Sequence, residues 1–241
     1  MSEAAAARRG DVEVLSAGSL RLLGLMPGAS NFTYLAEVRA GGRGVRAVYK
    51  PRRGEAPLWD FPDGTLCNRE VAAFLLAEAL GWPAVPPTVL RDGPHGRGAV
   101  QLFVDADPGA HYFTMREERA DEFRRVAAFD VVANNADRKA GHCLLGAGGR
   151  IWQIDHGLCF GAAYKLRTVI WEFAGEPLPA GLAGDLERTA GSLRGGPLRA
   201  SMLGLLSAEE VDATAGRAEA LAEAGAFPHP GPGRPYPWPQ I

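Results

Sequence analysis

Short apolar runs separated by glycine turns predict strands at the beginning of the chain. Residues 12–50 show this pattern throughout. Within them, apolar segments at 34–39 and 45–50 flank the sequence Ala40-Gly41-Gly42-Arg43-Gly44, which is typical of a β-hairpin because glycine permits the left-handed backbone of a tight turn. We therefore expect antiparallel strands in this part of the protein.

The hydrophobic periodicity then changes from that of a strand to that of a helix. Residues 66–80 carry helix-forming side chains at helical spacing, and Gly81 ends the segment. Two further apolar runs, 85–90 and 99–104, enclose the turn-rich segment 91–98 and predict a second pair of strands. The predicted order up to this point is strands, helix, strands.

The rest of the chain is predicted to be mostly helical. A charged stretch begins a second helix over 116–134, a short hairpin is expected over 143–154, and helical segments fill 181–224. From residue 227 onward there are six prolines among fifteen residues, which predicts an extended or disordered tail. We accordingly divide the chain into three regions: an N-terminal lobe at 1–104, a C-terminal lobe at 105–226 and a proline-rich tail at 227–241.

Composition and charge narrow the class of protein. The 241 residues are 46% hydrophobic and 22% charged, which suits a folded chain with a sizeable core. The net charge of −2 provides no overall positive field to hold nucleic acid or an anionic membrane. Three cysteines without a CxxC pair favour a reducing cytoplasm over a disulfide framework or a structural zinc site. With no secretory signal and no long apolar run, we expect a cytoplasmic protein without a membrane span.

Candidate catalytic side chains flank the second predicted hairpin. Asp137 and His142 precede its first strand, and Asp155 follows its second. Because a tight turn brings the outer ends of two strands together, we expect the three side chains to converge. An acid between a strand and the turn residue Gly157 is suited to a divalent cation, although an Asp at such a position is also common for structural reasons alone.

Lys50 and Glu70 form a second candidate pair. Glu70 shares a helix face with Phe74 and Ala77, so it is expected to point to the apolar side, where a carboxylate needs a partner. Lys50, at the end of a strand, is the natural partner, and the pair would hold the lysine ready for a phosphate. The alternative is that Glu70 faces outward near the start of the helix, where acids favour the helix dipole.

The order of these residues resembles the nucleotide site of the protein-kinase-like superfamily, in particular its phosphatidylinositol 3-/4-kinase branch and the HipA-type bacterial kinases. The likeness to type II phosphatidylinositol 4-kinases covers roughly residues 20–165. It rests on five segments: Val48-Tyr49-Lys50-Pro51, Asn68-Arg69-Glu70-Val71-Ala72-Ala73-Phe74-Leu75-Leu76, Val85-Pro86-Pro87-Thr88, Asn135-Ala136-Asp137-Arg138 and Ile154-Asp155-His156-Gly157-Leu158-Cys159-Phe160. The chain as a whole also resembles an actinobacterial group of kinase-like proteins.

This resemblance implies the fold and the roles of the main residues. The implied fold is α+β and two-lobed, with an antiparallel sheet and a helix in the N-terminal lobe and a mostly helical C-terminal lobe. Lys50 would contact the α- and β-phosphates of ATP, and Glu70 would orient Lys50. Asp137 would accept or guide the proton of the phosphate acceptor, and Asp155 would hold Mg²⁺.

Other nucleotide contacts are implied at two places in the N-terminal lobe. Ser30 and Asn31 lie in a turn between two predicted strands, where the family has its phosphate-covering loop, although an ordinary turn is nearly as good an interpretation. The segment with Gln101, Phe103 and Val104 would form the hinge against the adenine, mainly through its backbone groups.

Two histidines depart from the family's pattern. The family usually has an Asn that ligates the second metal at the position of His142. Imidazole binds Mn²⁺ or a softer metal better than Mg²⁺. The sequence therefore leaves undecided whether the bound ion is Mg²⁺ or Mn²⁺. His156 stands where the family has an aromatic residue or Asn. These changes weaken the inference of catalysis more than that of nucleotide binding.

The leading prediction is therefore an ATP-dependent phosphotransferase. Its acceptor would be a protein hydroxyl, a lipid head group or a small alcohol, with lipid slightly disfavoured because no basic amphipathic helix is evident. The alternatives are a nucleotide-binding pseudokinase that regulates a partner and a nucleotidyl transferase on the same fold. A hydrolase built on Asp137, His142 and Asp155 is the outsider, since no Ser or Cys nucleophile lies in an elbow motif.

Overall fold

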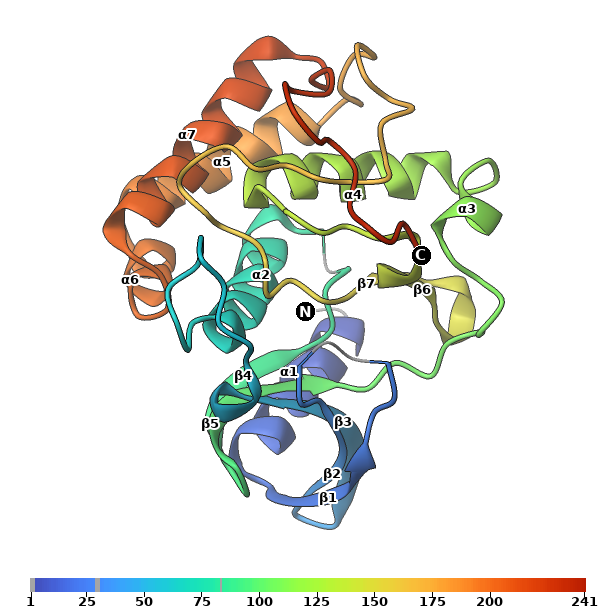
Figure 1. Ribbon diagram of the computed structural model, residues 1–241, viewed down its shortest axis with the longest axis vertical. Helices are drawn as coiled ribbons and strands as arrows, with labels where there is room; N and C mark the ends of the chain where they lie inside the picture. Colours follow the sequence, from blue (N-terminus) through green and yellow to red (C-terminus); the bar gives the residue numbers. More distant parts are fainter. Residues whose placement is uncertain (1–2, 29–30, 83) are drawn as a thin grey trace.

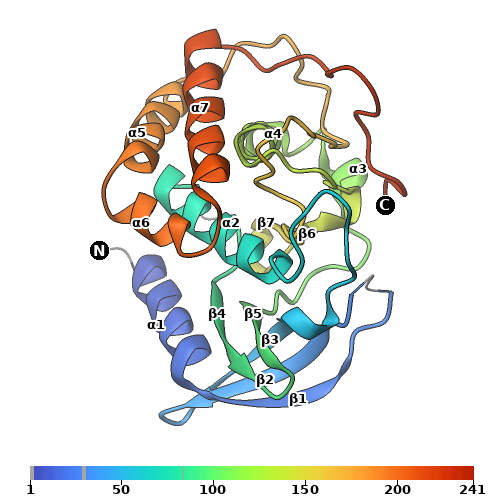
Figure 2. The ribbon, with the colours of Figure 1, turned by 60° about the vertical axis from the view of Figure 1, so that its left-hand side comes forward.

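The computed structural model describes residues 3–28, 31–82 and 84–241. A β-sheet and one helix lie at one end of the molecule, and most of the helices lie at the other (Figure 1). Helix α2 (Leu66–Leu80) belongs to the N-terminal half of the sequence and runs between the two groups (Figure 2). The α+β, two-lobed fold that the sequence predicts is therefore present.

The N-terminal lobe contains a five-stranded antiparallel sheet in the order β1-β2-β3-β5-β4. Its strands are β1 (Ser19–Leu25), β2 (Tyr34–Ala40), β3 (Arg43–Pro51), β4 (Thr88–Gly93) and β5 (Gly96–Leu102). The predicted β2–β3 hairpin turns at Gly41 and Gly42, whose φ angles of 55° and 80° require the left-handed region. The β4–β5 hairpin also forms. Its strands extend into residues 91–98, where Arg91 pairs with Gly98 and Asp92 with Arg97. This end of the hairpin carries polar side chains, which is why the apolar pattern did not indicate a strand there.

The beginning of the chain corrects the prediction of strands from residue 12 onward. Helix α1 (Glu3–Ala17) precedes β1 and is an alanine-rich segment with high helix propensity. Val14 and Leu15 are both buried against the sheet, where they join Ala36 and Tyr49 in one cluster. Two consecutive buried residues fit a helix face packed on a sheet and not a strand, in which neighbours point to opposite sides.

Helix α2 has the bounds that the sequence predicts. Gly81 ends it in the left-handed conformation, with φ 73°, and donates its N–H to the carbonyls of Ala77 and Glu78. Most of the helix is buried, including two charged side chains, Arg69 and Glu70. A buried charge on such a helix requires a partner, and this requirement connects the helix to the candidate site.

The C-terminal lobe is built on helices that pack around α2. Its elements are α3 (Tyr112–Met115), α4 (Ala120–Ala133), η2 (Ala140–His142), β6 (Cys143–Leu145), η3 (Ala147–Gly149), β7 (Ile151–Gln153), α5 (Leu182–Arg194), α6 (Pro197–Leu203) and α7 (Ala208–Ala224); a further short helix, η1 (Arg52–Gly54), follows β3. The β6–β7 hairpin forms as predicted. The helix expected over 116–134 is α4, which begins at Ala120 because residues 116–119 form a turn, and the short helix α3 precedes this range. Within the described residues, no helix is long and apolar enough to cross a membrane.

The proline-rich tail is extended and is held against the C-terminal lobe (Figure 2). The carbonyl of Pro235 accepts hydrogen bonds from the N–H of Thr168 at 3.0 Å and from the indole of Trp171 at 3.1 Å. The carbonyl of Gln240 accepts from the N–H of Ala140 at 2.8 Å. Proline lacks the backbone N–H that an inner strand needs, but its carbonyl can still accept hydrogen bonds. A proline-rich segment can therefore lie along a surface that offers hydrogen-bond donors.

Candidate functional site

Three side chains from both lobes meet at the inner side of the sheet. Lys50, near the end of β3, forms an ion pair through Nζ with Oε1 of Glu70 in α2. The same Nζ lies 3.0 Å from Oδ1 of Asp155, which follows β7. The Glu70 side chain is 3% exposed, so the outward orientation considered as an alternative does not occur.

The charges of this triad stabilise one another. Burial alone would lower the pKa of Lys50, but the negative charges of Asp155 and Glu70 outweigh it and raise that pKa. The positive charge of Lys50 lowers the pKa of Asp155, whose side chain is half exposed. Burial raises the pKa of Glu70, while Lys50 and the N–H of His156, 3.1 Å from Oε2, oppose that rise. Lys50 is therefore a cation and Asp155 an anion at neutral pH.

Asp155 takes a backbone conformation that only a few residue types tolerate. Its φ is 61°, in the left-handed region, immediately after the strand ladder ends at Gln153. Aspartate visits this region more readily than most residues with a Cβ, at a strain cost on the order of 1 kcal/mol. The turn leaves the carboxylate between Lys50 on one side and His142 on the other.

His142 contacts Asp155 through its imidazole ring. Nε2 lies 3.4 Å from Oδ2 of Asp155, and Nδ1 accepts the N–H of Lys139. Burial lowers the pKa of His142 to about 4, and the charges of Arg138 and Lys139 act in the same direction against Asp155. The ring is therefore neutral at physiological pH, which is the form that ligates metals.

Asp137 lies in the loop between α4 and η2. Its Oδ2 pairs with Nζ of Lys139 at 3.2 Å, and its N–H donates to Oδ1 of Asn135 at 3.0 Å. Burial raises the pKa of Asp137, Lys139 opposes this, and the negative charge of Asp155 adds to the rise. Asp137 is therefore close enough to Asp155 for their charges to interact, while His142 contacts Asp155 directly.

Arg138 is a residue of this site that the sequence analysis did not single out. Its side chain is fully buried, donates to both carboxylate oxygens of Asp130 in α4, and donates to the carbonyl of Ile154 at 3.0 Å. It also reaches Oε1 of Gln153 at 3.2 Å and Nε2 of His156 at 2.9 Å. Arg138 thus fastens the loop that carries Asp137 to the hairpin that leads to Asp155.

A sequence signal for this arginine does exist. Asp130 lies beside Phe129 and Val132 in the buried part of α4, so it presents the same requirement for a partner as Glu70. Arg138, eight residues later, is the group that satisfies it. An acidic residue within the apolar pattern of a helix, such as Asp130, is therefore a signal that a basic residue will be buried against it.

The predicted hinge residues lie where β5 leaves the sheet. Gln101 is buried, pairs with Val48 of β3, and donates through Nε2 to Oγ1 of Thr88 at 2.9 Å. The N–H of Phe103 donates to the carbonyl of Arg46 at 3.0 Å, and Val104 follows it. The side chain of Gln101 is therefore used inside the lobe, and any base contact at this segment falls to backbone groups.

The predicted phosphate-covering loop is described only in part. Ser30 lies outside the described residues. Oδ1 of Asn31 accepts the N–H of Ala56 at 2.8 Å, and the carbonyl of Asn31 accepts Oγ1 of Thr33. Asn31 therefore connects the loop to the segment that leads into α2.

The donor set suits a divalent cation that arrives with phosphate groups. Among the described residues, no three His, Cys, Asp or Glu side chains gather into a metal cage. Asp155 and His142 nevertheless present an ionised carboxylate and a neutral imidazole side by side. Two protein donors are enough for Mg²⁺ or Mn²⁺ when phosphate oxygens and water complete the shell. Because Nδ1 accepts a hydrogen bond in the neutral ring, Nε2 carries the proton; to ligate a cation through Nε2, His142 would have to leave Asp155 and move that proton to Nδ1.

Comparison with solved structures places the fold in the protein-kinase-like class. The structure of hydra Fam20 with sugar is similar with a TM-score of 0.54 and 12% identity, over 93% of this chain and 89% of that one. The Golgi casein kinase with Mn/ADP bound is similar with a TM-score of 0.50 and 12% identity, over 90% and 74% of the two chains. At these identities the likeness concerns the fold alone.

Sequence comparison defines the family more narrowly. No family model matches the chain. Protein Rv2133c of Mycobacterium tuberculosis is 42% identical, with 94% of each chain covered, so this chain belongs to the same family as Rv2133c. Phosphatidylinositol 4-kinase gamma 4 of rice (Oryza sativa subsp. japonica) is 31% identical over 43% of this chain, which corresponds to 22% of the plant protein. The resemblance to HipA-type kinases stays a prediction.

Proposed function

We propose that this protein is an ATP-dependent phosphotransferase of the phosphatidylinositol 3-/4-kinase-like superfamily. The contact of Lys50 with both Glu70 and Asp155 carries the proposal, because it joins a phosphate-binding cation, its orienting acid and a metal-binding acid across two lobes. The kinase-like fold and the partial match to a plant phosphatidylinositol 4-kinase support it. In this proposal residues 1–104 form the nucleotide-binding lobe and residues 105–226 the catalytic lobe.

The residues would divide the reaction among them. Lys50 would bind the α- and β-phosphates of ATP, and Glu70 would keep its ammonium group in place. The oxygen of the acceptor hydroxyl would form a bond to the γ-phosphorus of ATP, and its proton would pass to Asp137. The bond between the γ-phosphorus and the oxygen that bridges it to the β-phosphate would break, which releases ADP. The raised pKa of Asp137 suits a group that takes up a proton.

Asp155 and His142 would hold Mg²⁺ or Mn²⁺ beside the phosphates. A bound cation would neutralise negative charge on the phosphate oxygens. The fold neighbour that carries Mn/ADP supports a nucleotide and a divalent ion as ligands. The imidazole of His142 favours Mn²⁺ over Mg²⁺, because Mg²⁺ prefers oxygen ligands.

We propose a hydroxyl acceptor, belonging to a protein, a lipid head group or a small alcohol, and a cytoplasmic setting. Cys67, Cys143 and Cys159 are all buried and free, which agrees with a reducing compartment. A pseudokinase is the second candidate, and His142 at the second metal position is the observation that favours it. A nucleotidyl transferase on the same fold remains the third.

The first test is calorimetry of ATP binding with Mg²⁺ and with Mn²⁺, followed by analysis of the products. ADP or autophosphorylation supports the phosphotransferase, AMP supports nucleotidyl transfer, and tight binding without turnover supports the pseudokinase. Lys50→Met is expected to weaken both binding and turnover, whereas Asp137→Asn should abolish turnover at nearly unchanged ATP affinity. Asp121→Asn, which alters a 94% exposed carboxylate, is the matched control. Absence of nucleotide binding with both ions would refute the proposal.

A further inference from the structure

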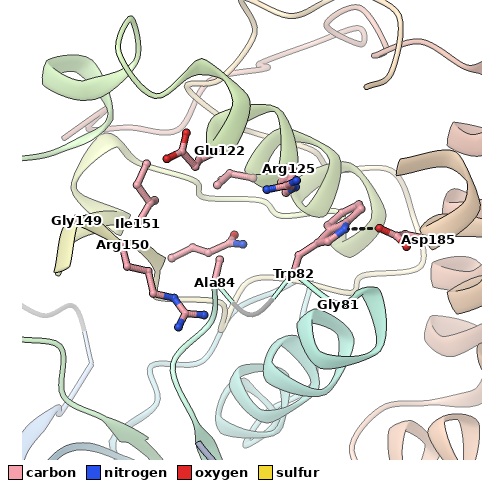
Figure 3. Close-up of a pocket in the computed structure, with 11 residues that line it drawn as sticks. Gly81, Trp82, Ala84, Glu122, Arg125, Gly149, Arg150, Ile151 and Asp185 are labelled. Atoms are coloured by element: carbon pink, nitrogen blue, oxygen red, sulfur yellow. Dashed lines mark hydrogen bonds between the residues drawn. The ribbon is translucent and has the colours of Figure 1, made fainter. Parts of the chain in front are cut away.

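A cavity of about 400 Å³ opens where the segment after α2 meets the C-terminal lobe, and none of the triad Lys50, Glu70 and Asp155 lines it. Its wall combines the residues after α2, one face of α4, the β6–β7 hairpin and the start of α5 (Figure 3). None of the residues proposed to bind nucleotide or metal lines it. The volume falls in the range of sites that hold small organic molecules.

The inner surface of the cavity is apolar. Trp82, Val126 and Ile151 line it and are 5%, 2% and 6% exposed, so their side chains are fixed in the core. Ala84 adds a small side chain next to Trp82 (Figure 3). A bound molecule would therefore place a compact apolar body against a rigid surface.

The two acids of the cavity are already neutralised by partners. Oε1 of Glu122 pairs with Arg119 at 3.1 Å. Asp185 accepts the indole N–H of Trp82 at 2.9 Å, the contact drawn in Figure 3, and pairs with Arg188 at the same distance. These carboxylates stabilise the wall and leave little negative charge to attract a cation.

Two arginines also line the cavity. The side chain of Arg125 in α4 forms no hydrogen bond or ion pair with a described residue, and its positive charge contributes to lowering the pKa of Asp185. The guanidinium of Arg150 lies 4.1 Å from the ring centroid of Trp152, and partial burial lowers the pKa of Arg150. The two side chains extend from different walls of the cavity (Figure 3). An anionic group would stabilise either of them.

We propose that this cavity binds a small organic anion, a carboxylate or a phosphate monoester with an apolar body. The anionic group would contact Arg125 or Arg150, and the body would pack on Trp82, Val126 and Ile151. The cavity also borders the catalytic loop, because Gln153 lines it and accepts a hydrogen bond from Arg138 at 3.2 Å. The proposal does not depend on the reaction that the other site performs.

The test compares probes that share one apolar body and differ in charge. Titrations of the full protein with 3-phenylpropionate, phenyl phosphate and 3-phenylpropylamine are followed by ligand-observed NMR. We expect saturable binding of at least one anion and an affinity at least tenfold lower for the amine. The ratio of the two anion affinities distinguishes a carboxylate ligand from a phosphate ligand. Equal binding of the amine, or no saturable binding of either anion, would overturn the proposal.

Variants locate the binding. The double substitution Arg125→Gln, Arg150→Gln should lower the anion affinity at least tenfold, while Arg97→Gln, at an exposed arginine of the β4–β5 ribbon, should leave it unchanged. Ala84→Leu adds three carbon atoms to the apolar wall and should weaken anion binding by obstructing the site; it provides a second test if the double variant does not fold. Unchanged anion affinity in the folded double variant or in Ala84→Leu would place the binding elsewhere and refute the proposal.

Discussion

Replacement of Arg138 by methionine tests whether the buried ion pair beside the site stabilises the fold. Arg138 and Asp130 are both fully buried, and their guanidinium and carboxylate are joined by several hydrogen bonds of about 3 Å. Arg138→Met keeps much of the side-chain volume but leaves the Asp130 carboxylate without its counter-ion. Of its other contacts, Asn135 at 2.9 Å and Thr168 at 3.3 Å remain, and both are neutral.

The expected loss follows from leaving one charge buried alone. Breaking a buried pair from one side costs about 3–5 kcal/mol of the free energy of unfolding. For a chain of this length, about 4 kcal/mol corresponds to a fall of roughly 10 °C in melting temperature. Asp130→Asn combined with Arg138→Met removes both charges, so the double variant should lose less than the two single variants together, by about 1 kcal/mol or more.

Urea denaturation followed by tryptophan fluorescence measures the four free energies of this cycle. Arg21→Met is the control, because Arg21 pairs with Glu37 while 71% exposed, and its loss should be below about 1 kcal/mol. A loss at Arg138 no larger than that of the control would contradict the reasoning. Strict additivity of the two single substitutions would contradict it as well.

Three further outcomes are expected. His142→Asn should raise the ratio of the Mg²⁺-supported to the Mn²⁺-supported turnover rate, because an amide oxygen replaces the imidazole; an unchanged ratio would show that His142 is no ligand. Deletion of residues 231–241 removes the hydrogen bonds that the tail accepts from Ala140 and Thr168. Because Ala140 lies between Asp137 and His142, the deletion should lower kcat while calorimetry shows unchanged ATP affinity; an unchanged kcat would contradict this role of the tail. Gly98→Ala brings a Cβ to 2.5 Å from a backbone oxygen and should lower stability by about 1–3 kcal/mol, whereas Gly191→Ala in exposed helix should raise it by up to about 1 kcal/mol, both measured by thermal melting.

Much of the local structure could be predicted from neighbouring residues. The Gly41-Gly42 turn, the helix over residues 66–80 and the β6–β7 hairpin depend on backbone preferences and on periodicity within short segments. The pairing of Lys50 with Glu70 also followed from the sequence, because a carboxylate on an apolar helix face requires a cation. The catalytic and metal-binding roles of the site residues stay predictions.

Other features depend on contacts between distant segments. Residues 12–17 were predicted to begin a strand, whereas they continue the alanine-rich helix α1, and its packing on the sheet buries both Val14 and Leu15. The tail has no local pattern that predicts its course, yet the C-terminal lobe offers donors at Ala140 and Thr168 that hold it in place.

The sequence by itself determined the order of the main elements after α1 and the pair of charges that the buried helix face required, because both follow from short-range periodicity and from the cost of an unpaired charge. Only the tertiary structure decided that Asp155 would reach Lys50, that Arg138 would join the loop to the hairpin, and that two arginines would face one cavity. These contacts depend on how helices and strands distant in the chain pack together, and no local pattern encodes those distances.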